Sequence, residues 1–345
     1  MGDTIMSSSD TKRPKILTNV LGQYNLAEAQ IIELRDKGKK TVWQINSNGK
    51  KMVLKKMPTS VTRTEFIVEA TEFLLNNNVR VPKIIKNNNQ EKFVVVGNDA
   101  YILMNWIDGK QPDYQRHLEG ILSSMALFHR GSRGFIPNVE ANRRTHLGTW
   151  LKSYQQKKNH LLAYAEQANK EKEKDAFTEL FLQHLKLAVQ RIDQAIELLE
   201  KSDYEEWVKD VDQNGSLCHQ DFTPKNLRLD SKGDITVFDL DSITVDLPAR
   251  DLRKIFNKVL KKDGTGKERL IKRMVDAYQA CNPLTSSQWE VVVADLLFPH
   301  LFFGIVDKYY RHRAPDWDFG KHLKTLKHAI RTEEYKETIG LPKLM

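Results

Sequence analysis

The chain has 345 residues, of which 40% are hydrophobic and 29% charged, a composition typical of a soluble globular protein large enough for two lobes. It contains 54 lysine and arginine residues against 45 aspartate and glutamate residues, so its net charge of +9 favours an anionic partner, although a solvated lysine-rich surface is the simpler explanation. The two cysteines, Cys218 and Cys281, exclude a disulfide framework and a zinc site, and they favour a reducing compartment.

Three short strands are predicted first in the chain, at residues 30–35, 41–45 and 51–56. Asn48 and Gly49 lie between the second and the third of these strands. Because both residues tolerate a positive φ, they predict a tight hairpin turn at this point.

A helix is predicted next, over residues 63–78, because Phe66, Ala70 and Leu74 recur there at helical spacing. It is expected to end in the run of three asparagines that precedes Pro82. This helix would complete the set of elements that surrounds the predicted strands.

The character of the chain changes near residue 108. Before that point, a second hairpin is predicted from residues 92–97 and 100–106. After it, the apolar residues follow a 3.6-residue rhythm. Amphipathic helices are therefore predicted at residues 117–130, 145–167 and 175–201.

The longest apolar run, residues 291–306, contains Asp295, Pro299 and His300. It falls short of the ~20 uninterrupted apolar residues that span a bilayer, so we predict a buried core helix and no membrane span. The whole pattern predicts an α+β protein, with a small β-rich N-terminal lobe and a larger helical C-terminal lobe.

The predicted organisation has three parts. Residues 1–14 are polar, contain no apolar segment of the secretory type, and are expected to be mobile without acting as a signal peptide. Residues 15–107 are predicted to form a nucleotide-binding N-terminal lobe. Residues 108–345 are predicted to form the helical lobe, with one embedded hairpin at residues 217–241.

The embedded hairpin carries an unusual set of polar side chains, His219-x-Asp221-x4-Asn226, followed on the returning strand by Asp239. Asn226 and Asp239 flank the two strands, so both are expected at the open end of the hairpin. An amide oxygen and a carboxylate suit Mg²⁺, which fills its other positions with water and phosphate. Asp221, in the preceding loop, is then free to accept a proton from an attacking hydroxyl group. The structural alternative makes all three of these residues turn and capping groups.

This arrangement resembles the catalytic core of the kinase superfamily, in the form found in the aminoglycoside phosphotransferase and choline kinase branch. "MVLKK", "FIVEATEFLLNNNVRVPKII", "YILMNWIDG" and "LSSMALFHR" resemble, in order, that branch's lysine-bearing strand, glutamate-bearing helix, hinge and first large-lobe helix. The resemblance implies a bilobal protein-kinase-like fold of the aminoglycoside phosphotransferase type. It also implies that Lys55, fixed by Glu69, binds nucleotide phosphates, and that backbone groups of Met104 and Trp106 meet adenine.

Two adjacent lysines compete for the phosphate-binding role. Side chains alternate along a strand, so Lys55 shares a face with Val53 and Lys56 shares one with Leu54. A small apolar residue two positions before the lysine suits a wall against adenine, and we therefore choose Lys55. Taken alone, "LKK" would be a pair of surface charges on an edge strand.

The same resemblance assigns roles in the embedded hairpin. It makes Asp221 the catalytic base and makes Asn226 and Asp239 ligands of Mg²⁺. Asp241 either reaches a second metal ion or faces solvent, since it lies two residues farther along the chain. His219 is expected to brace the metal-binding segment rather than to react.

Two longer runs, "FDLDSITVDLPARDLRKIFNKVLKK" and "FPHLFFGIVDKYYRHR", most resemble the spore-coat kinase-like proteins of the CotS type from endospore-forming bacteria. The resemblance covers most of residues 30–330. It implies synthesis in the cytoplasm of the mother cell, followed by a place in the spore coat. The implied cofactors are ATP, or another nucleoside triphosphate, and Mg²⁺. The implied partners are a small-molecule or polysaccharide acceptor and other spore coat proteins, with no nucleic acid and no membrane span.

Two departures from the kinase pattern bear on activity. The first hairpin loop has a single glycine, Gly38, in place of a glycine-rich cradle, so basic side chains of that loop would have to supply charge. Asp239-Leu240-Asp241 stands where protein kinases have Asp-Phe-Gly, and only nine residues, 242–250, separate it from Asp251. That is too short for a segment that displays a peptide substrate, which disfavours a protein kinase.

The sequence therefore predicts ATP- and Mg²⁺-dependent phosphoryl transfer to a hydroxyl group of a small molecule or glycan. The alternative is a catalytically weak or inactive kinase fold that acts as a scaffold in coat assembly, and the glycine-poor loop motivates it. The acceptor is expected over the helical lobe, where six aromatic residues either form a sugar-stacking wall or, more simply, pack in the core. They are Trp289, Phe298, Phe302, Phe303, Tyr309 and Tyr310.

Overall fold

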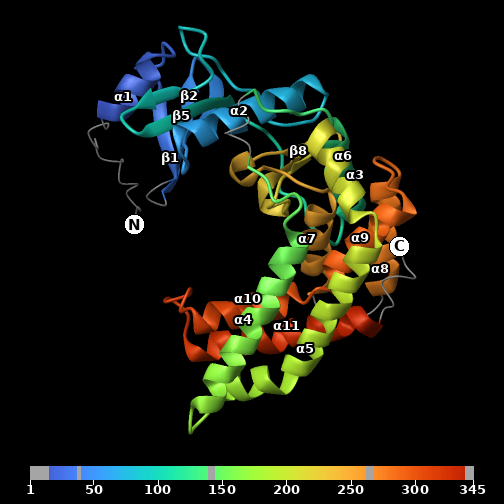
Figure 1. Ribbon diagram of the computed structural model, residues 1–345. Helices are drawn as coiled ribbons and strands as arrows, with labels where there is room; N and C mark the ends of the chain where they lie inside the picture. The colour runs from blue at the N-terminus through green and yellow to red at the C-terminus, as the bar shows by residue number, and fades with distance from the viewer. Residues whose placement is uncertain (1–14, 37–39, 139–143, 262–266, 339–345) are drawn as a thin grey trace, which may run out of the picture. The chain divides into compact units, whose positions relative to one another are not determined.

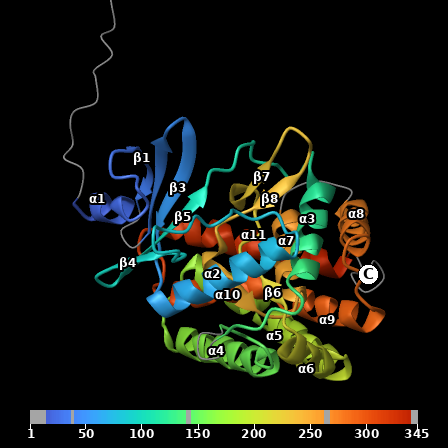
Figure 2. The ribbon, with the colours of Figure 1, turned by 90° about the horizontal axis from the view of Figure 1, so that it is seen from above.

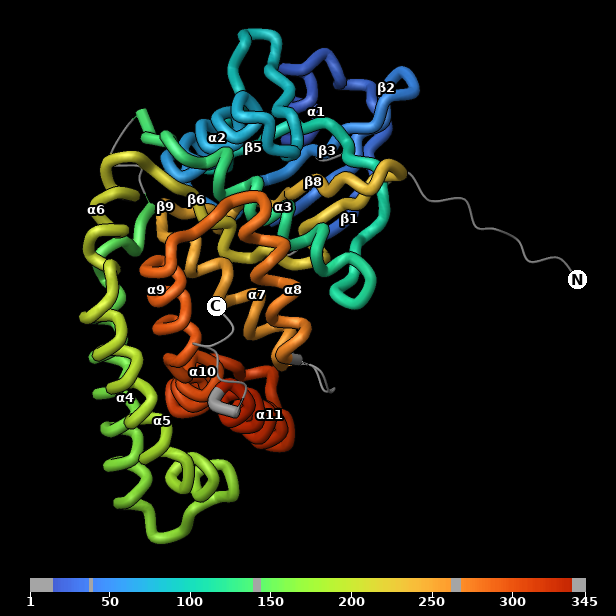
Figure 3. Tube along the Cα trace, turned by 90° about the vertical axis from the view of Figure 1, so that its right-hand side faces the viewer, coloured from blue at the N-terminus to red at the C-terminus, as the bar shows by residue number. Residues whose placement is uncertain are grey.

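The computed structural model divides the chain into two compact units, which Figure 1, Figure 2 and Figure 3 show from three sides. The first unit comprises Met1–Leu75 and Pro82–Ile107, and the second comprises Asn76–Val81 and Asp108–Met345. The predictions made for residues 1–14 and for Gly38 lie outside the residues that the structure describes. The described residues are 15–36, 40–138, 144–261 and 267–338.

The first unit is built on an antiparallel sheet with the strand order β1-β2-β3-β5-β4. The turn between β2 and β3 has φ of 50° at Asn48 and 71° at Gly49, which confirms the predicted hairpin and its cause. The predicted strands at residues 92–97 and 100–106 form the second hairpin, β4–β5. The bounds are β1 (Gln30–Asp36), β2 (Thr41–Ser47), β3 (Lys50–Lys56), β4 (Val94–Val96) and β5 (Asp99–Asn105).

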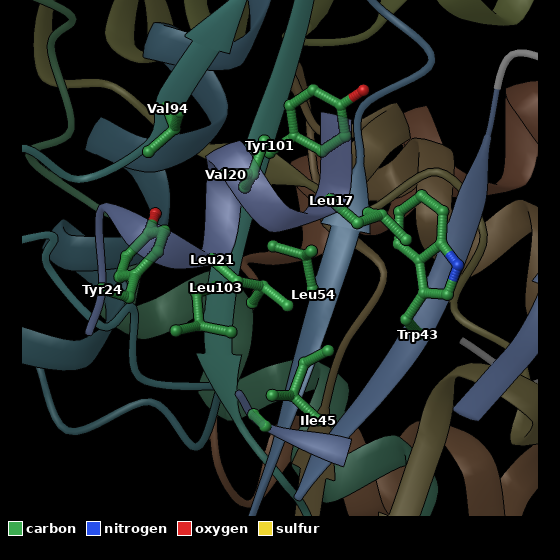
Figure 4. Packing of buried hydrophobic residues seen from close by; sticks show 11 residues of the cluster. Leu17, Val20, Leu21, Tyr24, Trp43, Ile45, Leu54, Val94, Tyr101 and Leu103 are labelled. Carbon is green, nitrogen blue, oxygen red and sulfur yellow. The ribbon is translucent and has the colours of Figure 1, made fainter. Parts of the chain in front are cut away.

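One face of this sheet is covered by a short helix, α1 (Lys15–Gly22). Leu17 and Leu21 of α1 pack with Ile45 of β2 and Leu54 of β3 in the core of the first unit, as Figure 4 shows. Ile45 and Leu54 are fully buried. Their burial stabilises the unit through the hydrophobic effect, and it fixes which residues of each strand face inward.

The opposite face of the sheet therefore carries the alternate residues. In the β3–β5 register, Val53 lies opposite Met104 and Lys55 lies opposite Ile102. The helix predicted over residues 63–78 follows β3 as α2 (Val61–Asn76), two residues earlier at both ends.

The second unit is mainly helical. α4 and α5 lie side by side (Figure 3), α9 packs against α5 and α7, and α3 packs against α8. The bounds are α3 (Leu118–Gly131), α4 (Trp150–Lys170), α5 (Ala176–Lys201), α6 (Tyr204–Asn214), α7 (Ala249–Leu260), α8 (Lys267–Gln279), α9 (Ser286–Leu297), α10 (His300–Tyr310) and α11 (Phe319–Thr338).

The embedded hairpin lies among these helices, beside α3 (Figure 2). It consists of β7 (Leu227–Leu229) and β8 (Ile235–Val237), and β6 (Leu217–Cys218) pairs with β9 (Thr244–Val245) next to it. The second strand ends at Val237, because the chain turns sharply at Asp239.

The long apolar run forms two helices, α9 and α10, rather than the single helix predicted over residues 291–306. α9 ends at Leu297 and α10 begins at His300, and Pro299 between them has no backbone N–H with which to continue a helix. Within the described residues, Ser286–Tyr310 is the one helical stretch long and apolar enough to cross a membrane by length and composition alone. In the structure, 67% of its most apolar window is buried.

Candidate functional site

The hairpin brings Asn226 and Asp239 to the same end of its two strands. Leu227 pairs with Val237, and the N–H of Phe238 donates to the carbonyl oxygen of Asn226 over 3.0 Å. Asp239 follows directly and adopts the left-handed conformation, with φ 64° and ψ 58°. A non-glycine residue rarely adopts this conformation, and such strain gathers at functional sites.

Asn226 is oriented by the loop that precedes the hairpin. Its Nδ2 donates to Oδ2 of Asp221 over 3.0 Å and to the carbonyl oxygen of Asp221 over 2.9 Å. The amide nitrogen is thus committed, whereas Oδ1 accepts no hydrogen bond from any residue that the structure describes. Asn226 is only 5% exposed, so this oxygen is a fixed group suited to a cation ligand.

His219 links the loop to the hairpin. Its Nδ1 accepts a hydrogen bond from the N–H of Asp221 over 3.2 Å, and its Nε2 lies 3.0 Å from the carbonyl oxygen of Phe238. Because a carbonyl can only accept, Nε2 carries the proton and the ring is neutral. Burial also lowers the pKa of His219, which favours this neutral form.

Asp251, in the first turn of α7, binds the backbone of the loop that contains His219 and Gln220. Its Oδ2 accepts from the N–H of His219 over 2.6 Å, and its Oδ1 accepts from the N–H of Gln220 over 2.9 Å. Burial disfavours the ionised carboxylate, but the hydrogen bond from His129 and its charge outweigh burial and hold the pKa of Asp251 at about 2. Asp251 therefore fixes two consecutive backbone amides of the loop.

His129, Cys218 and Asp251 offer ligand atoms that lie within 4.8 Å of one another, all buried. Each already has partners inside the protein: Sγ of Cys218 donates to the carbonyl oxygen of Leu247 over 3.1 Å. Burial raises the pKa of the Cys218 thiol well above its ordinary value, so the thiolate that a metal requires is disfavoured. This cluster is a packed hydrogen-bond network that supports the loop.

Asp221 lies between two lysines. Nζ of Lys225 is 2.9 Å from its Oδ2, and Nζ of Lys258 is 3.3 Å from its Oδ1. Burial raises the pKa of Asp221, but the two ammonium groups outweigh burial and lower it below its ordinary value. The carboxylate is therefore ionised at neutral pH, in the form that can accept a proton.

Gln220, between His219 and Asp221, has a φ of 70°, the second left-handed non-glycine residue of the site. Arg250 donates to its Oε1 over 2.9 Å, and Nζ of Lys254 donates to its carbonyl oxygen over 2.6 Å. Its Nε2 donates to the hydroxyl of Thr244 over 2.6 Å. These bonds hold the strained loop in place from α7 and β9.

The first unit presents Lys55, Met104 and Trp106 on or beside β3 and β5. Lys55 is 6% exposed, whereas Lys56 pairs with Asp99 over 2.6 Å at the surface. The two lysines thus differ in burial. Lys55 lies on the face opposite Leu54, and Lys56 shares the face of Leu54 but lies at the end of the strand. The N–H of Trp106 donates to the carbonyl oxygen of Lys51 over 3.4 Å, so this backbone group already has a partner.

Comparison with known proteins identifies the family. A sequence profile of the family "Spore coat putative kinase YutH" matches residues 19–340. Spore coat protein S of Bacillus subtilis (strain 168) is 30% identical over 334 residues, which are 96% of this chain and 95% of that protein. The chain belongs to the YutH family of spore coat kinase-like proteins.

Solved structures extend the comparison of this YutH-family chain to its fold. An aminoglycoside phosphotransferase from Alicyclobacillus acidocaldarius subsp. acidocaldarius DSM 446 is similar with a TM-score of 0.78 at 18% identity, covering 98% of this chain and 96% of that one. A spectinomycin phosphotransferase in complex with ADP and spectinomycin has a TM-score of 0.64 at 14% identity, covering 95% and 99%. A microcompartment-associated aminopropanol kinase has a TM-score of 0.62 at 13% identity, covering 96% and 99%.

The YutH-family chain therefore has the α+β, bilobal, protein-kinase-like fold of the aminoglycoside phosphotransferase type, with a small β-rich lobe and a larger helical lobe. This confirms the predicted fold class and the predicted family. The roles of the individual residues are not decided by a likeness of fold.

Of the predicted site residues, the structure joins Asp221 to Asn226 by hydrogen bonds and places Asp239 next to Asn226 along the hairpin. Asp241 lies in the short helical turn Leu240–Ser242 that follows. Lys55, Glu69, Met104 and Trp106 belong to the first unit.

Sequence reasoning missed several residues of this site. Lys258 contacts Asp221, Lys254 contacts Gln220, and Asp251 accepts hydrogen bonds from two backbone N–H groups of the loop. The four-residue spacing of Arg250, Lys254 and Lys258 was the available signal, because such residues share one face of a helix.

Half of the six aromatic residues proposed as an acceptor wall are core. Trp289, Phe298 and Phe302 are at most 4% exposed, so the packing alternative describes these three better. Phe303, Tyr309 and Tyr310 are partly exposed. Tyr309 stacks on Phe177 with ring centroids 3.9 Å apart.

Proposed function

We propose that this YutH-family protein is a phosphotransferase that uses ATP, or another nucleoside triphosphate, with Mg²⁺, and phosphorylates a hydroxyl group of a small molecule or glycan. The observation that carries the proposal is the arrangement at the mouth of the hairpin. There, Nδ2 of Asn226 is bound to Asp221 and Oδ1 is left for a cation, with Asp239 adjacent. A hard-oxygen ligand pair beside an ionised, lysine-flanked carboxylate suits phosphoryl transfer.

The proposed reaction follows from the position of Asp221. The hydroxyl oxygen of the acceptor forms a bond to the γ-phosphorus while the bond from that phosphorus to the β–γ bridging oxygen breaks, and the nucleoside diphosphate leaves. The hydroxyl proton passes to the carboxylate of Asp221 and then to solvent. Asp221 orients the hydroxyl group, so most of the catalysis is positioning.

The donor set fits Mg²⁺, because an amide oxygen and carboxylates are hard ligands that leave room for phosphate. Asn226 and Asp239 would hold the ion, and Asp241 would hold a second one. Bound there, Mg²⁺ neutralises charge on the transferred phosphoryl group and its leaving group. His219 keeps the two protein ligands in register by joining the loop to Phe238.

The proposed nucleotide contacts lie in the first unit. Lys55, with Glu69 as its partner, would bind the α- and β-phosphates, and its deep burial favours it over Lys56. The side chain of Met104 shares the face of Lys55 and would contact adenine, with Trp106 at the end of the same stretch. Similarity to a spectinomycin phosphotransferase solved with ADP supports the use of a nucleotide.

The proposed setting is the spore coat, after synthesis in the cytoplasm of the mother cell. Spore coat protein S, at 30% identity over nearly the whole chain, supports this location. The partners we propose are a small-molecule or polysaccharide acceptor and other spore coat proteins.

A thermal-shift titration with ATP and MgCl₂, followed by an ADP-release assay, tests the proposal. Ligand that binds only the native state stabilises it by about 2.7 kcal/mol at 100 times the Kd, so the melting temperature should rise. Asp239→Asn should lose the Mg²⁺-dependent part of the rise. Asp221→Asn should keep the rise and lose ~10²–10⁴-fold in turnover.

The scaffold alternative makes the opposite prediction. A protein that uses the fold only for coat assembly would show no rise in melting temperature at millimolar nucleotide, with or without Mg²⁺. That result would remove the phosphotransferase proposal.

A further inference from the structure

α7 presents three cations to the loop that contains Asp221. Arg250, Lys254 and Lys258 recur every four residues and so share one face of the helix. Lys258 contacts Asp221, whereas Arg250 and Lys254 contact the neighbouring Gln220. The hydrogen bonds of Lys254 go to two neutral oxygen atoms of Gln220, over 2.6 and 2.7 Å. Lys254 donates no hydrogen bond to a carboxylate among the described residues.

Lys157, on α4, is a half-buried cation in aromatic surroundings. Its Nζ lies 5.6 Å from the ring centroid of Tyr154, 5.1 Å from that of Phe298 and 5.8 Å from that of Phe303. It forms no hydrogen bond or ion pair with any residue that the structure describes. Three ring faces offset part of the cost of removing an ammonium group from water. They do not replace the hydrogen bonds that an anion would accept from that group.

The acidic groups near these cations are already in use. The carboxylate of Asp295 accepts hydrogen bonds from Tyr154, from His300 over 2.6 Å and from Arg253 over 3.2 Å. It still attracts Lys157 electrostatically, but Lys157 forms no hydrogen bond with it in the described part of the chain.

Asp251 and Asp246 also lie close to this group. Asp251 is ionised and attracts Lys254, but its oxygens already accept hydrogen bonds from His129 and from the N–H groups of His219 and Gln220. Asp246 forms an ion pair with Arg250. Its Oδ2 lies 3.5 Å from Nη1 of Arg250, a distance that gives attraction without a hydrogen bond. Burial raises the pKa of Asp246 to about 7, so it carries only part of a charge at neutral pH.

The charges of four cations act on His146. Burial first, and then the charges of Arg250, Arg144, Lys254 and Lys157, lower the pKa of His146 to about 4, so it is neutral at pH 7. Burial also lowers the pKa of Lys157 and that of Lys254 to about 8, so both ammonium groups keep most of their charge at pH 7.

We infer that Lys157, Arg250 and Lys254 form an anion-binding subsite for the acceptor, and that the acceptor carries a carboxylate or a phosphate near the hydroxyl group to be phosphorylated. The inference rests on the proposed function, since only a phosphotransferase has an acceptor. The subsite is assigned to the acceptor because it adjoins Gln220, the residue next to the proposed base Asp221. The nucleotide phosphates have their own proposed partners, which are Lys55 and the Mg²⁺ that Asn226 and Asp239 would hold. A cationic acceptor would be repelled at this subsite.

The smallest probe of the subsite is inorganic phosphate, titrated calorimetrically at pH 7 into the full-length protein saturated with ADP and Mg²⁺. ADP fills the α- and β-phosphate positions of the nucleotide site. Phosphate that binds instead at the open γ-phosphate position would be insensitive to Lys157→Met, so the variant separates the two sites. We expect saturable binding that Lys157→Met and Arg250→Gln each weaken by roughly 10- to 100-fold, the value of one charged hydrogen bond. Lys152→Met is the matched control, an exposed lysine on the same helix, and should leave the affinity unchanged.

Several outcomes overturn the inference. It falls if phosphate does not bind, or if Lys157→Met and Arg250→Gln bind phosphate with the same affinity as the native protein. It also falls if an adventitious ion only is found, that is, if the heat of binding is weak and does not saturate. If ADP and Mg²⁺ do not bind to the native protein, while phosphate still binds and Lys157→Met still weakens that binding, the anion site stands and the failure lies with the proposed function.

Turnover separates the two possible anions. ADP release is measured with glucose, glucosamine, glucuronate and glucose 6-phosphate, which share one ring and differ in charge. A kcat/KM at least tenfold higher for glucuronate or for glucose 6-phosphate than for glucose supports the inference and identifies the carboxylate or the phosphate. A preference for glucosamine or for neutral glucose overturns it.

Discussion

At the scale of single residues, Asp251 decides the geometry of the site without lying in it. Its two oxygens accept from the consecutive N–H groups of His219 and Gln220, and it also accepts from His129. Nδ1 of His129 lies 2.8 Å from the hydroxyl of Tyr278, so the support continues into α8. Removing one member of such a buried network leaves the others unsatisfied, which costs more than the lost bond itself.

We therefore predict that Asp251→Asn destabilises the protein in a pH-dependent way. The pKa of Asp251 is about 2 in the folded protein, below its ordinary value of 3.8, so folding favours the ionised form. This stability is fully present above the unfolded pKa and is lost as the pH falls through the folded one. Asp251→Asn should lose about 2–4 kcal/mol at pH 7, and its difference from the native protein should narrow between pH 5 and pH 2.

Urea unfolding at a series of pH values measures this difference. Asp276→Asn is the control, because Asp276 is an exposed partner of Lys272 and should contribute little at any pH. A constant gap between Asp251→Asn and the native protein from pH 7 to pH 2 would show that the charge of Asp251 plays no part.

At the scale of elements, neighbouring side chains of β3 lie on opposite faces of the sheet and have different surroundings. Leu54 faces the core under α1, and Lys55 and Val53 face the other side of the sheet with Met104. Lys56, on the face of Leu54 but at the end of the strand, reaches the surface. One strand thus buries an apolar residue and a cation on opposite faces of the same sheet.

We predict that Lys55→Met abolishes the rise in melting temperature caused by ATP and Mg²⁺, whereas Lys56→Met retains it. The two variants remove the same charge from adjacent positions, so the comparison isolates the face of the strand. Lys56→Met also breaks a surface pair with Asp99, which should cost at most about 1 kcal/mol. Equal loss of the nucleotide effect in both variants would argue against a phosphate site on this face.

The same elements show what the sequence could and could not predict. The hairpin that carries Asn226 and Asp239 was predictable, because strand pairing and turn residues are local in the sequence. The contact from Lys258 to Asp221 spans 37 residues and depends on where α7 packs. The grip of Asp251 on the loop likewise depends on the placement of that helix, which periodicity alone does not give.

At the scale of the whole molecule, two segments on the path of the chain between the units support the embedded hairpin. The chain enters the second unit briefly at Asn76–Val81, where the carbonyl oxygen of Arg80 accepts from the N–H of Val237 on β8 over 2.8 Å. It enters again at Asp108, where Lys110 exchanges two backbone hydrogen bonds with Leu229 on β7, over 3.0 and 2.8 Å. Each strand of the hairpin has only three residues, and the outer edge of each is paired in this way. This pairing stabilises so short an element.

Gly109 makes the pairing of Lys110 with Leu229 possible, and we predict that alanine at this position disrupts it. Its φ is 123°, and an added Cβ would lie 2.5 Å from the carbonyl oxygen of Leu229, a backbone atom that cannot move without displacing β7. Gly109→Ala should therefore destabilise the protein by about 3 kcal/mol or more, as measured by urea unfolding. It should also weaken nucleotide-dependent stabilisation, because β7 positions Asn226.

Gly233, in the turn of the same hairpin, provides the control. Its φ is 89° and an added Cβ would meet nothing within 4 Å, so Gly233→Ala should cost only the roughly 1–2 kcal/mol of a left-handed alanine. The nucleotide effect should survive in this variant. If the two alanine variants lose equal stability and equal nucleotide response, the pairing at Lys110 does not hold the hairpin, and the position of Asn226 and Asp239 must be set by the loop and α7 alone.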